Sequence, residues 1–229
     1  MSVFASRPEI MSSKVGIFAR SRGVWIALRA SHDNPTVHFL VLGGAPATTP
    51  AEQELISVIG LMRAEGRSEM EISSARDYYR LYFHVAHSGL DWSELENLAK
   101  LARSVKWGEY VDQPAAVSDL AWWGPNADFD TRDDARAVSV PTLAFWGSDD
   151  KVTPPEVHKA LIEAQLNASK SKSITVRIFA GGDHRGEARV GVDDYGKWHW
   201  FGMAPGLLDF LQEWITTHSI ESVNESDPR

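Results

Sequence analysis

Four short apolar segments, separated by stretches with helical patterns, constrain the fold of this chain more than any other feature. They cover residues 15–19, 37–42, 142–146 and 174–179, and the last three run into glycine-containing turns. Nearly continuous apolar strands are typical of a sheet that is covered on both faces. Because helical patterns lie between the strands, the sequence predicts an α/β fold with a mostly parallel sheet.

The long stretch between the second and third strands carries three helix starts and no strand. Each start pairs a capping residue with a glutamate three positions later, the spacing of a capping box: Thr49 with Glu52, Ser68 with Glu71, and Asp91 with Glu94. Three consecutive helices interrupt the alternation, so we place a helical cap insertion at residues 48–137. The core then comprises residues 1–47 and 138–220, and the polar segment 221–229 is expected to be a flexible tail.

Four tryptophans fall within the predicted cap: Trp92, Trp107, Trp122 and Trp123. Large aromatic side chains commonly fill the core of a small helical domain. The alternative is that one or two of them line an apolar pocket for an acyl group.

Composition excludes several classes of function. The 229 residues carry a net charge of -8 and contain no cysteine. A negative charge without a Lys/Arg cluster argues against nucleic-acid binding, and the lack of cysteine excludes disulfides, thiolate metal sites and a cysteine nucleophile. No signal peptide is visible in residues 1–14, and no apolar run is long enough to span a membrane. We therefore expect a cytoplasmic protein that does not bind membranes.

The first candidate catalytic motif is Ala19-Arg20-Ser21-Arg22-Gly23, between the first strand and a helix expected to begin at Arg22. A nucleophile elbow places serine on a sharp strand-to-helix turn, where small residues two positions away avoid clashes. Ser21 is therefore a candidate nucleophile, and the alternative is that it only caps the helix. The side chains of Arg20 and Arg22 either attract an acidic substrate or are solvated or paired with acidic residues.

Two further candidates follow later strands. Asp149 and Asp150 lie in the turn after the third strand, at the strand's carboxyl end, where open parallel sheets place catalytic groups. Either aspartate is also a candidate for a turn carboxylate that binds nearby backbone N–H groups. His184 lies on the glycine-rich loop after the last strand, next to Asp183, which we expect to bind the loop backbone.

The order of these candidates along the chain is Ser21, Asp150 and His184, the order that α/β-hydrolases use for nucleophile, acid and base. Each candidate directly follows a strand, so parallel strands would bring all three to the same edge of the sheet. The intervals leave room for a helix and a strand before His184 and for the cap before Asp150. The three candidates together indicate a catalytic triad more specifically than any one of them does alone.

On these motifs the chain resembles bacterial serine hydrolases of the α/β-hydrolase superfamily, near the prolyl-oligopeptidase-like and dienelactone-hydrolase-like branches. The resemblance covers nearly all of residues 7–218. It lies in the segment before the nucleophile strand, the helix after the elbow, the acid turn, the histidine loop and the closing helix: 7–16, 23–27, 147–155, 182–184 and 204–214. In the family pattern the aspartate three positions after glycine is the triad acid, so the resemblance favours Asp150 over Asp149.

The resemblance implies the C-terminal, triad-carrying part of the fold, that is, a truncated α/β-hydrolase fold without the usual N-terminal strands. The backbone N–H of Arg22 would supply one oxyanion donor. The family loop that supplies the second is not encoded in its usual place, because the nucleophile strand begins near residue 14.

The resemblance further implies a short-chain carboxylesterase-like enzyme that cleaves small-molecule esters through an acyl-enzyme, with no cofactor and no metal. The first alternative is a non-catalytic or weakly active protein that acts through oligomer or partner binding. In either case we expect a homodimer or larger assembly that covers the exposed edge of the nucleophile strand. The second alternative, a metal hydrolase, lacks any tight ligand motif and would use Asp149, Asp150, His184, Asp193, Asp194 and His199.

Overall fold

The computed structural model describes residues 15–189 and 201–220. The contacts divide the chain into two compact units, one made of residues 1–47 and 131–229 and the other of residues 48–130. All three triad candidates belong to the first unit. The predicted tail, residues 221–229, lies outside the described residues.

The first unit is built on a four-stranded sheet, as the four apolar segments predict. All neighbouring strands are parallel, in the order β1-β2-β3-β4. The strands are β1 (Ile17–Arg20), β2 (Leu40–Gly43), β3 (Thr142–Gly147) and β4 (Ile174–Phe179). β1 and β2 begin later than the apolar segments suggest and each includes one more residue at its carboxyl end, whereas β4 has the predicted bounds.

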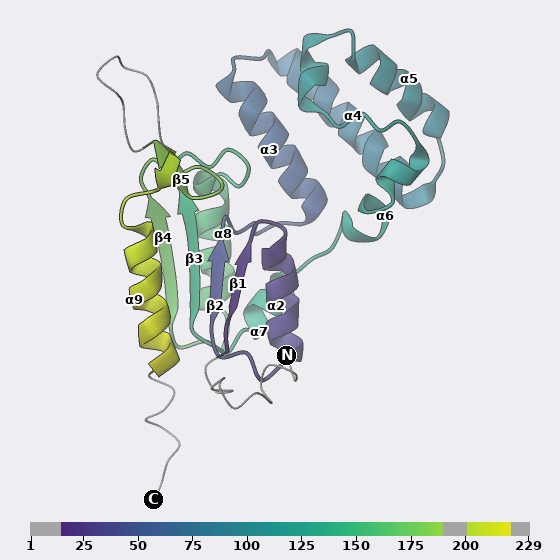
Figure 1. Cartoon of the computed structure of the whole chain (residues 1–229). Helices are drawn as coiled ribbons and strands as arrows, with labels where there is room; N and C mark the ends of the chain where they lie inside the picture. The colour runs from purple at the N-terminus through teal and green to yellow at the C-terminus, as the bar shows by residue number, and fades with distance from the viewer. Residues whose placement is uncertain (1–14, 190–200, 221–229) are drawn as a thin grey trace, which may run out of the picture. The chain divides into compact units, whose positions relative to one another are not determined.

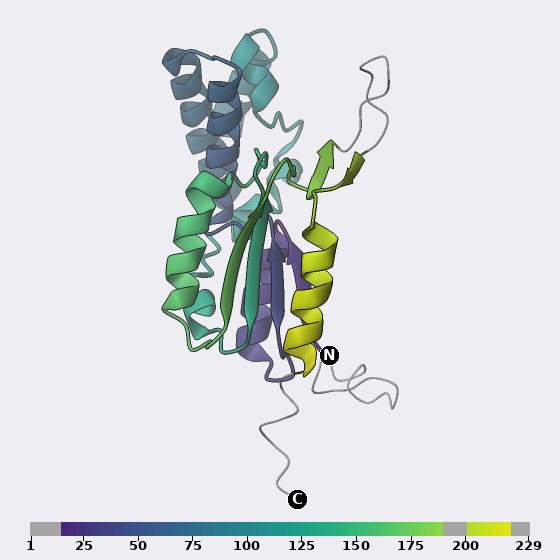
Figure 2. The ribbon, with the colours of Figure 1, turned by 90° about the vertical axis from the view of Figure 1, so that its left-hand side faces the viewer.

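Helices cover both faces of this sheet (Figures 1 and 2). On one face lie α2 (Gly23–Asp33), α7 (Arg132–Ala137) and α8 (Pro155–Asn167), and on the other lies α9 (Leu207–Ile220). Successive strand residues alternate between the two cores: Leu40 and Leu42 pack with the first group of helices, and Val41 packs with α9. This alternation explains why the central strands are apolar throughout.

α7 belongs to the sheet unit, so the helical insertion ends at residue 130 and not at residue 137. A partly buried ion pair joins α7 to the sheet unit, because the Nε atom of Arg29 on α2 donates to both carboxylate oxygens of Asp134 at 2.8 Å. His32 Nδ1 lies 3.1 Å from the same carboxylate. Ala135 and Val138 then pack into the core beneath α2 and α8.

A short antiparallel hairpin follows the histidine loop and is not predicted by the sequence pattern. It pairs β5 (Glu187–Arg189) with β6 (Phe201–Met203), directly before α9. Each strand is three residues long, too short to show a period of its own.

The second unit is entirely helical. It contains α3 (Pro50–Ala64), α4 (Glu69–Ser88), α5 (Trp92–Ala102), the 3-10 helices η2 (Lys106–Tyr110) and η3 (Val117–Leu120), and the short α6 (Trp123–Asn126). The capping boxes of Thr49 and Ser68 form as expected. Asp91 does precede α5, but its side chain makes no cap bond and lies 3.0 Å from His84 Nε2 instead.

An aromatic cluster forms the core of this unit. Trp107 and Trp123 are buried, and Trp92 packs against the same cluster. Trp122 is 40% exposed and stands edge-on to Trp123. The backbone N–H of Ala51 donates to the carbonyl of Ala127 at 2.9 Å, so the two ends of the insertion meet.

Among residues 15–189 and 201–220, no helix combines the length and the apolar character that crossing a membrane requires.

Candidate active site

Ser21 occupies a strained turn between β1 and α2. Its φ angle is +52°, in the left-handed region that side chains other than glycine rarely adopt. Its backbone N–H donates to the carbonyl of Gly43 at 2.9 Å, and its own carbonyl accepts from the N–H of Val24 at 2.9 Å. This conformation costs about 1–2 kcal/mol in an L-residue, and such outliers cluster at functional sites.

The side chain of Ser21 does not cap α2. Arg22 is the N-cap residue, and the helix has no side-chain cap bond. Within the described part of the chain, the half-buried hydroxyl of Ser21 makes no hydrogen bond, either to His184 or to another group. The capping alternative is therefore not supported, and Ser21 remains the candidate nucleophile. In ligand-free structures the bond from nucleophile to base is often long and tightens when substrate binds.

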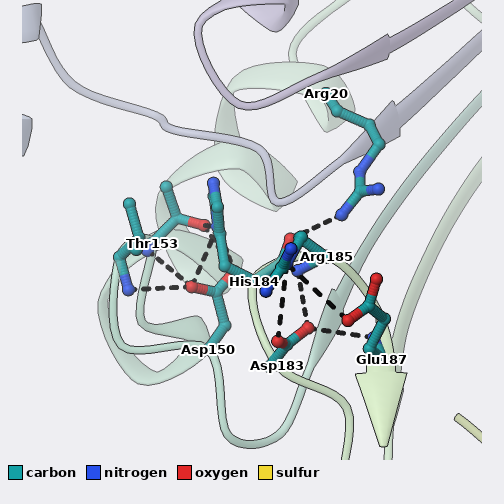
Figure 3. Close-up of polar contacts among 8 residues, drawn as sticks. Arg20, Asp150, Thr153, Asp183, His184, Arg185 and Glu187 are labelled. Carbon is teal, nitrogen blue, oxygen red and sulfur yellow. Dashed lines mark hydrogen bonds and ion pairs between the residues drawn. The ribbon is translucent and has the colours of Figure 1, made fainter. Parts of the chain in front are cut away.

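Asp150 lies buried in the turn after β3 and is held by four donors (Figure 3). The backbone N–H groups of Val152 and Thr153 donate to Oδ1 at 2.9 and 2.8 Å. The hydroxyl of Thr153 donates to Oδ2 at 2.7 Å. The fourth donor is His184, whose Nδ1 lies 2.9 Å from Oδ2 and 3.0 Å from Oδ1.

Burial acts to raise the pKa of Asp150, but the hydrogen bonds from His184 and Thr153 outweigh it, and the pKa lies below the usual value. The carboxylate is therefore ionised at neutral pH. An ionised carboxylate only accepts hydrogen bonds, so Nδ1 of His184 carries a proton and donates a hydrogen bond to Asp150.

Neither Asp149, the alternative candidate for the acid, nor Asp183 makes a hydrogen bond to the imidazole of His184. Asp149 is exposed, accepts from the hydroxyl of Ser148 at 2.9 Å and donates its N–H to the carbonyl of Gly182 at 2.8 Å. Asp183 shapes the histidine loop instead, as its Oδ1 accepts from the N–H groups of Arg185 and Glu187 at 2.7 and 2.9 Å. The geometry agrees with the glycine spacing that favours Asp150.

Gly44 places the histidine ring close to the nucleophile turn. Its φ angle is +54°, and a Cβ atom there would lie 3.0 Å from Cε1 and 3.1 Å from Nδ1 of His184. The backbone N–H of Ser21 bonds to Gly43 and the ring of His184 packs on Gly44, so the serine turn and the histidine ring lie against consecutive residues at the end of β2. The structure thus brings all three predicted triad residues to the carboxyl edge of one sheet.

Two residues of this site are not singled out by sequence reasoning, and a third, Arg20, has a partner that the sequence does not predict. Thr153 binds the Asp150 carboxylate, and Gly44 makes room for the imidazole. Arg20, expected to face acidic groups or solvent, donates from Nη2 to the backbone carbonyl of His184 at 2.7 Å. The aspartate-to-threonine spacing is a usable signal, because such carboxylates commonly bind N–H groups two or three residues on.

The predicted oxyanion donor is the backbone N–H of Arg22, the N-cap residue of α2. Arg22 precedes the first turn of α2, where backbone N–H groups point towards the helix N-terminus and favour negative charge. We identify no second donor among the described residues. No group of three or more potential ligands that could hold a metal ion occurs in the described part of the chain, and Asp193, Asp194 and His199 lie outside it.

Searches of protein-family models and of curated proteins find no match to this chain. Solved α/β-hydrolases are similar in structure at low identity. Acetyl xylan esterase 1 from Thermoanaerobacterium is 14% identical with a TM-score of 0.44, over 95% of this chain and 49% of the esterase. A monoacylglycerol lipase from Paleococcus ferrophilus is 18% identical with a TM-score of 0.44, over 90% of this chain and 69% of the lipase. An α/β fold family hydrolase from Bacillus anthracis is 14% identical with a TM-score of 0.45, over 90% of this chain and 67% of the hydrolase.

This chain thus spans about half the length of the esterase. With TM-scores below 0.5, these likenesses carry no argument about the chemistry, which has to rest on the geometry of the site itself.

Proposed function

We propose that this protein is a serine hydrolase that cleaves carboxylic esters through Ser21, His184 and Asp150. The observation that carries the proposal is the buried Asp150–His184 pair, with its 2.9 Å bond, at the sheet edge where Ser21 is held at a φ of +52°. A buried carboxylate that fixes the tautomer of an imidazole, beside a serine on a strained turn, is the arrangement that activates a hydroxyl.

In the first step the Ser21 hydroxyl attacks the ester carbonyl and His184 Nε2 takes the proton. Asp150 stabilises the imidazolium without becoming protonated. The backbone N–H of Arg22 donates to the oxyanion of the tetrahedral intermediate. Collapse of the intermediate releases the alcohol, which receives the proton from His184, and leaves the acyl group on Ser21.

In the second step water replaces the alcohol. His184 removes a proton from the water as it attacks the acyl-enzyme, and returns it to the Ser21 oxygen when the carboxylic acid leaves. The same residues therefore act in both halves of the reaction, and none of these steps uses a cofactor.

Ester substrates suit this site better than peptides. Loss of one oxyanion donor typically slows acyl transfer by about 10²–10³-fold. An ester has a better leaving group than an amide, so it tolerates weaker stabilisation of the intermediate. We expect the fastest turnover with short, activated acyl groups.

The test combines covalent labelling with turnover. A fluorophosphonate probe is expected to label Ser21 in the folded wild type but not in Ser21→Ala or His184→Ala, while Ser31→Ala, on the helix α2 that follows the turn, labels normally. Hydrolysis of p-nitrophenyl acetate and butyrate should follow the same order. Wild-type protein that is not labelled, or equal rates for wild type and Ser21→Ala, would favour the non-catalytic alternative.

A further inference from the structure

Arg20 connects the nucleophile turn to the histidine loop. It is the last residue of β1 and directly precedes Ser21, and its Nη2 donates to the carbonyl of His184 at 2.7 Å (Figure 3). The two residues are 164 positions apart in the chain. The contact therefore joins the first strand of the sheet to the loop that follows the last strand of the sheet.

The path of this side chain depends on a gap at Gly43. Arg20, Gly43 and Phe145 lie in register on neighbouring strands, on the same face of the sheet. A Cβ atom at Gly43 would lie 3.2 Å from Cγ of Arg20 and 2.7 Å from the ring of Phe145. Glycine at this position lets the Arg20 stem lie over β2 beside the Phe145 ring and reach the loop.

His184 is consequently held at two points. Its ring is bound by the Asp150 carboxylate at 2.9 Å, and its backbone carbonyl is bound by the Arg20 guanidinium at 2.7 Å. The ring bond alone leaves the backbone of the glycine-rich loop able to shift, which would move Nε2 relative to Ser21. A bond from a charged donor is shorter and roughly twice as strong as a neutral one.

We propose that Arg20 is a positioning residue that fixes the distance between Ser21 and the imidazole of His184. The role rests on the proposed serine hydrolase function. In this role the guanidinium of Arg20 binds the backbone of the protein itself and not an acidic substrate. A misplacement of about 1 Å at a reacting group can cost about 10²-fold in rate, so the anchor acts on kcat and leaves the KM of a neutral ester unchanged.

The experiment compares wild type with Arg20→Met, which keeps the length of the side chain and removes the donor. We expect kcat on p-nitrophenyl acetate to fall about 10- to 100-fold with little change in KM, and the rate of fluorophosphonate labelling to fall by the same factor. Added guanidinium ion, far below unfolding concentrations, should restore part of the rate. Arg177→Ala, which removes an exposed arginine in register with Phe145, is the matched control and should behave as wild type.

Amide hydrogen exchange gives a readout that does not depend on activity. Exchange in residues 181–188 is expected to be faster in Arg20→Met than in wild type and unchanged in Arg177→Ala. A kcat for Arg20→Met within twofold of wild type, unchanged exchange in the loop, or an equal loss in Arg177→Ala would overturn the proposal.

If Arg20→Met does not fold, Arg20→Lys decides the question, because lysine keeps the charge but lacks the planar reach of the guanidinium. Wild-type values of both kcat and exchange in Arg20→Lys would contradict the anchor. Wild-type activity that does not require Ser21 would overturn the proposed hydrolase, and with it any catalytic role for Arg20. The exchange comparison still tests the anchor in that case.

Discussion

His158 should make the stability of this protein depend on pH. It lies on α8 with no exposed surface, and its Nδ1 accepts the N–H of Ala47 at 3.2 Å. Its Nε2 is buried and has no hydrogen-bond partner among the described residues. Burial lowers the pKa of His158 from 6.5 to about 4, although the negative charge of Asp150 opposes the shift.

The lowered pKa of His158 fixes both the sign and the size of the change in folding stability with pH. Above pH 6.5 the imidazole is neutral in the folded and unfolded chains, so its contribution to stability is fully present. Between pH 6.5 and about 4 the unfolded chain binds a proton that the folded protein rejects. The free energy of unfolding then falls by about 1.4 kcal/mol per pH unit, or about 3 kcal/mol over the window. Protonation of Nδ1 would also remove the acceptor for Ala47.

Urea unfolding followed by circular dichroism, at several pH values from 7.5 to 4, measures this loss. His158→Asn is the reference, because its amide oxygen can still accept the Ala47 N–H but does not titrate. The variant is expected to be less stable than wild type at pH 7.5 and to approach or exceed it at pH 4. Other groups titrate in both proteins and cancel. Parallel stability curves for the two proteins would refute the reasoning.

Four further outcomes are expected. Ser21→Gly should be more stable than Ser21→Ala by about 1 kcal/mol in urea unfolding, because glycine removes the strain of the positive φ angle that alanine keeps; equal stability would argue against strain. Gly44→Ala should lower kcat because its Cβ would lie 3.0 Å from the ring of His184, and a wild-type kcat would contradict that packing. Asp150→Asn should lower kcat by about 10⁴-fold, since an amide no longer fixes the imidazole tautomer; a loss below tenfold would count against Asp150 as the acid. Sedimentation should find a dimer or larger assembly, because β1 is an edge strand of the described sheet and its Phe18 is 53% exposed; a monomer at micromolar concentration would contradict it.

Much of the sheet could be predicted from local pattern alone. The central strands β2 and β3 are apolar because they are buried on two faces, and the parallel direction of the strands follows from their connections through helices. The candidates for the triad were chosen because each follows a strand, and the structure places all three after the carboxyl ends of strands. The family resemblance favours Asp150 over Asp149 through the spacing to Gly147, and the structure places only Asp150 against His184.

Features that depend on register or on distant partners could not be predicted. The reach of Arg20 to His184 requires Gly43 to lie beside it on β2, which no local pattern encodes. The place of α7 depends on the contact between Arg29 and Asp134, which are 105 positions apart. The positive φ angle of Ser21 occurs in a turn whose N–H bonds to Gly43 on the neighbouring strand, a partner distant in sequence.

The bond between Ala51 and Ala127 has a consequence for the order in which this chain folds. Pairing β2 with β3 closes a connection of roughly 100 residues, and the entropy cost of closing such a loop grows only slowly with its length. The helical unit has its own aromatic core and its ends meet at 2.9 Å. Once that unit has folded, only the short flanking connections remain to be closed. An insertion that separates the two central strands in sequence therefore behaves, kinetically, as a short loop.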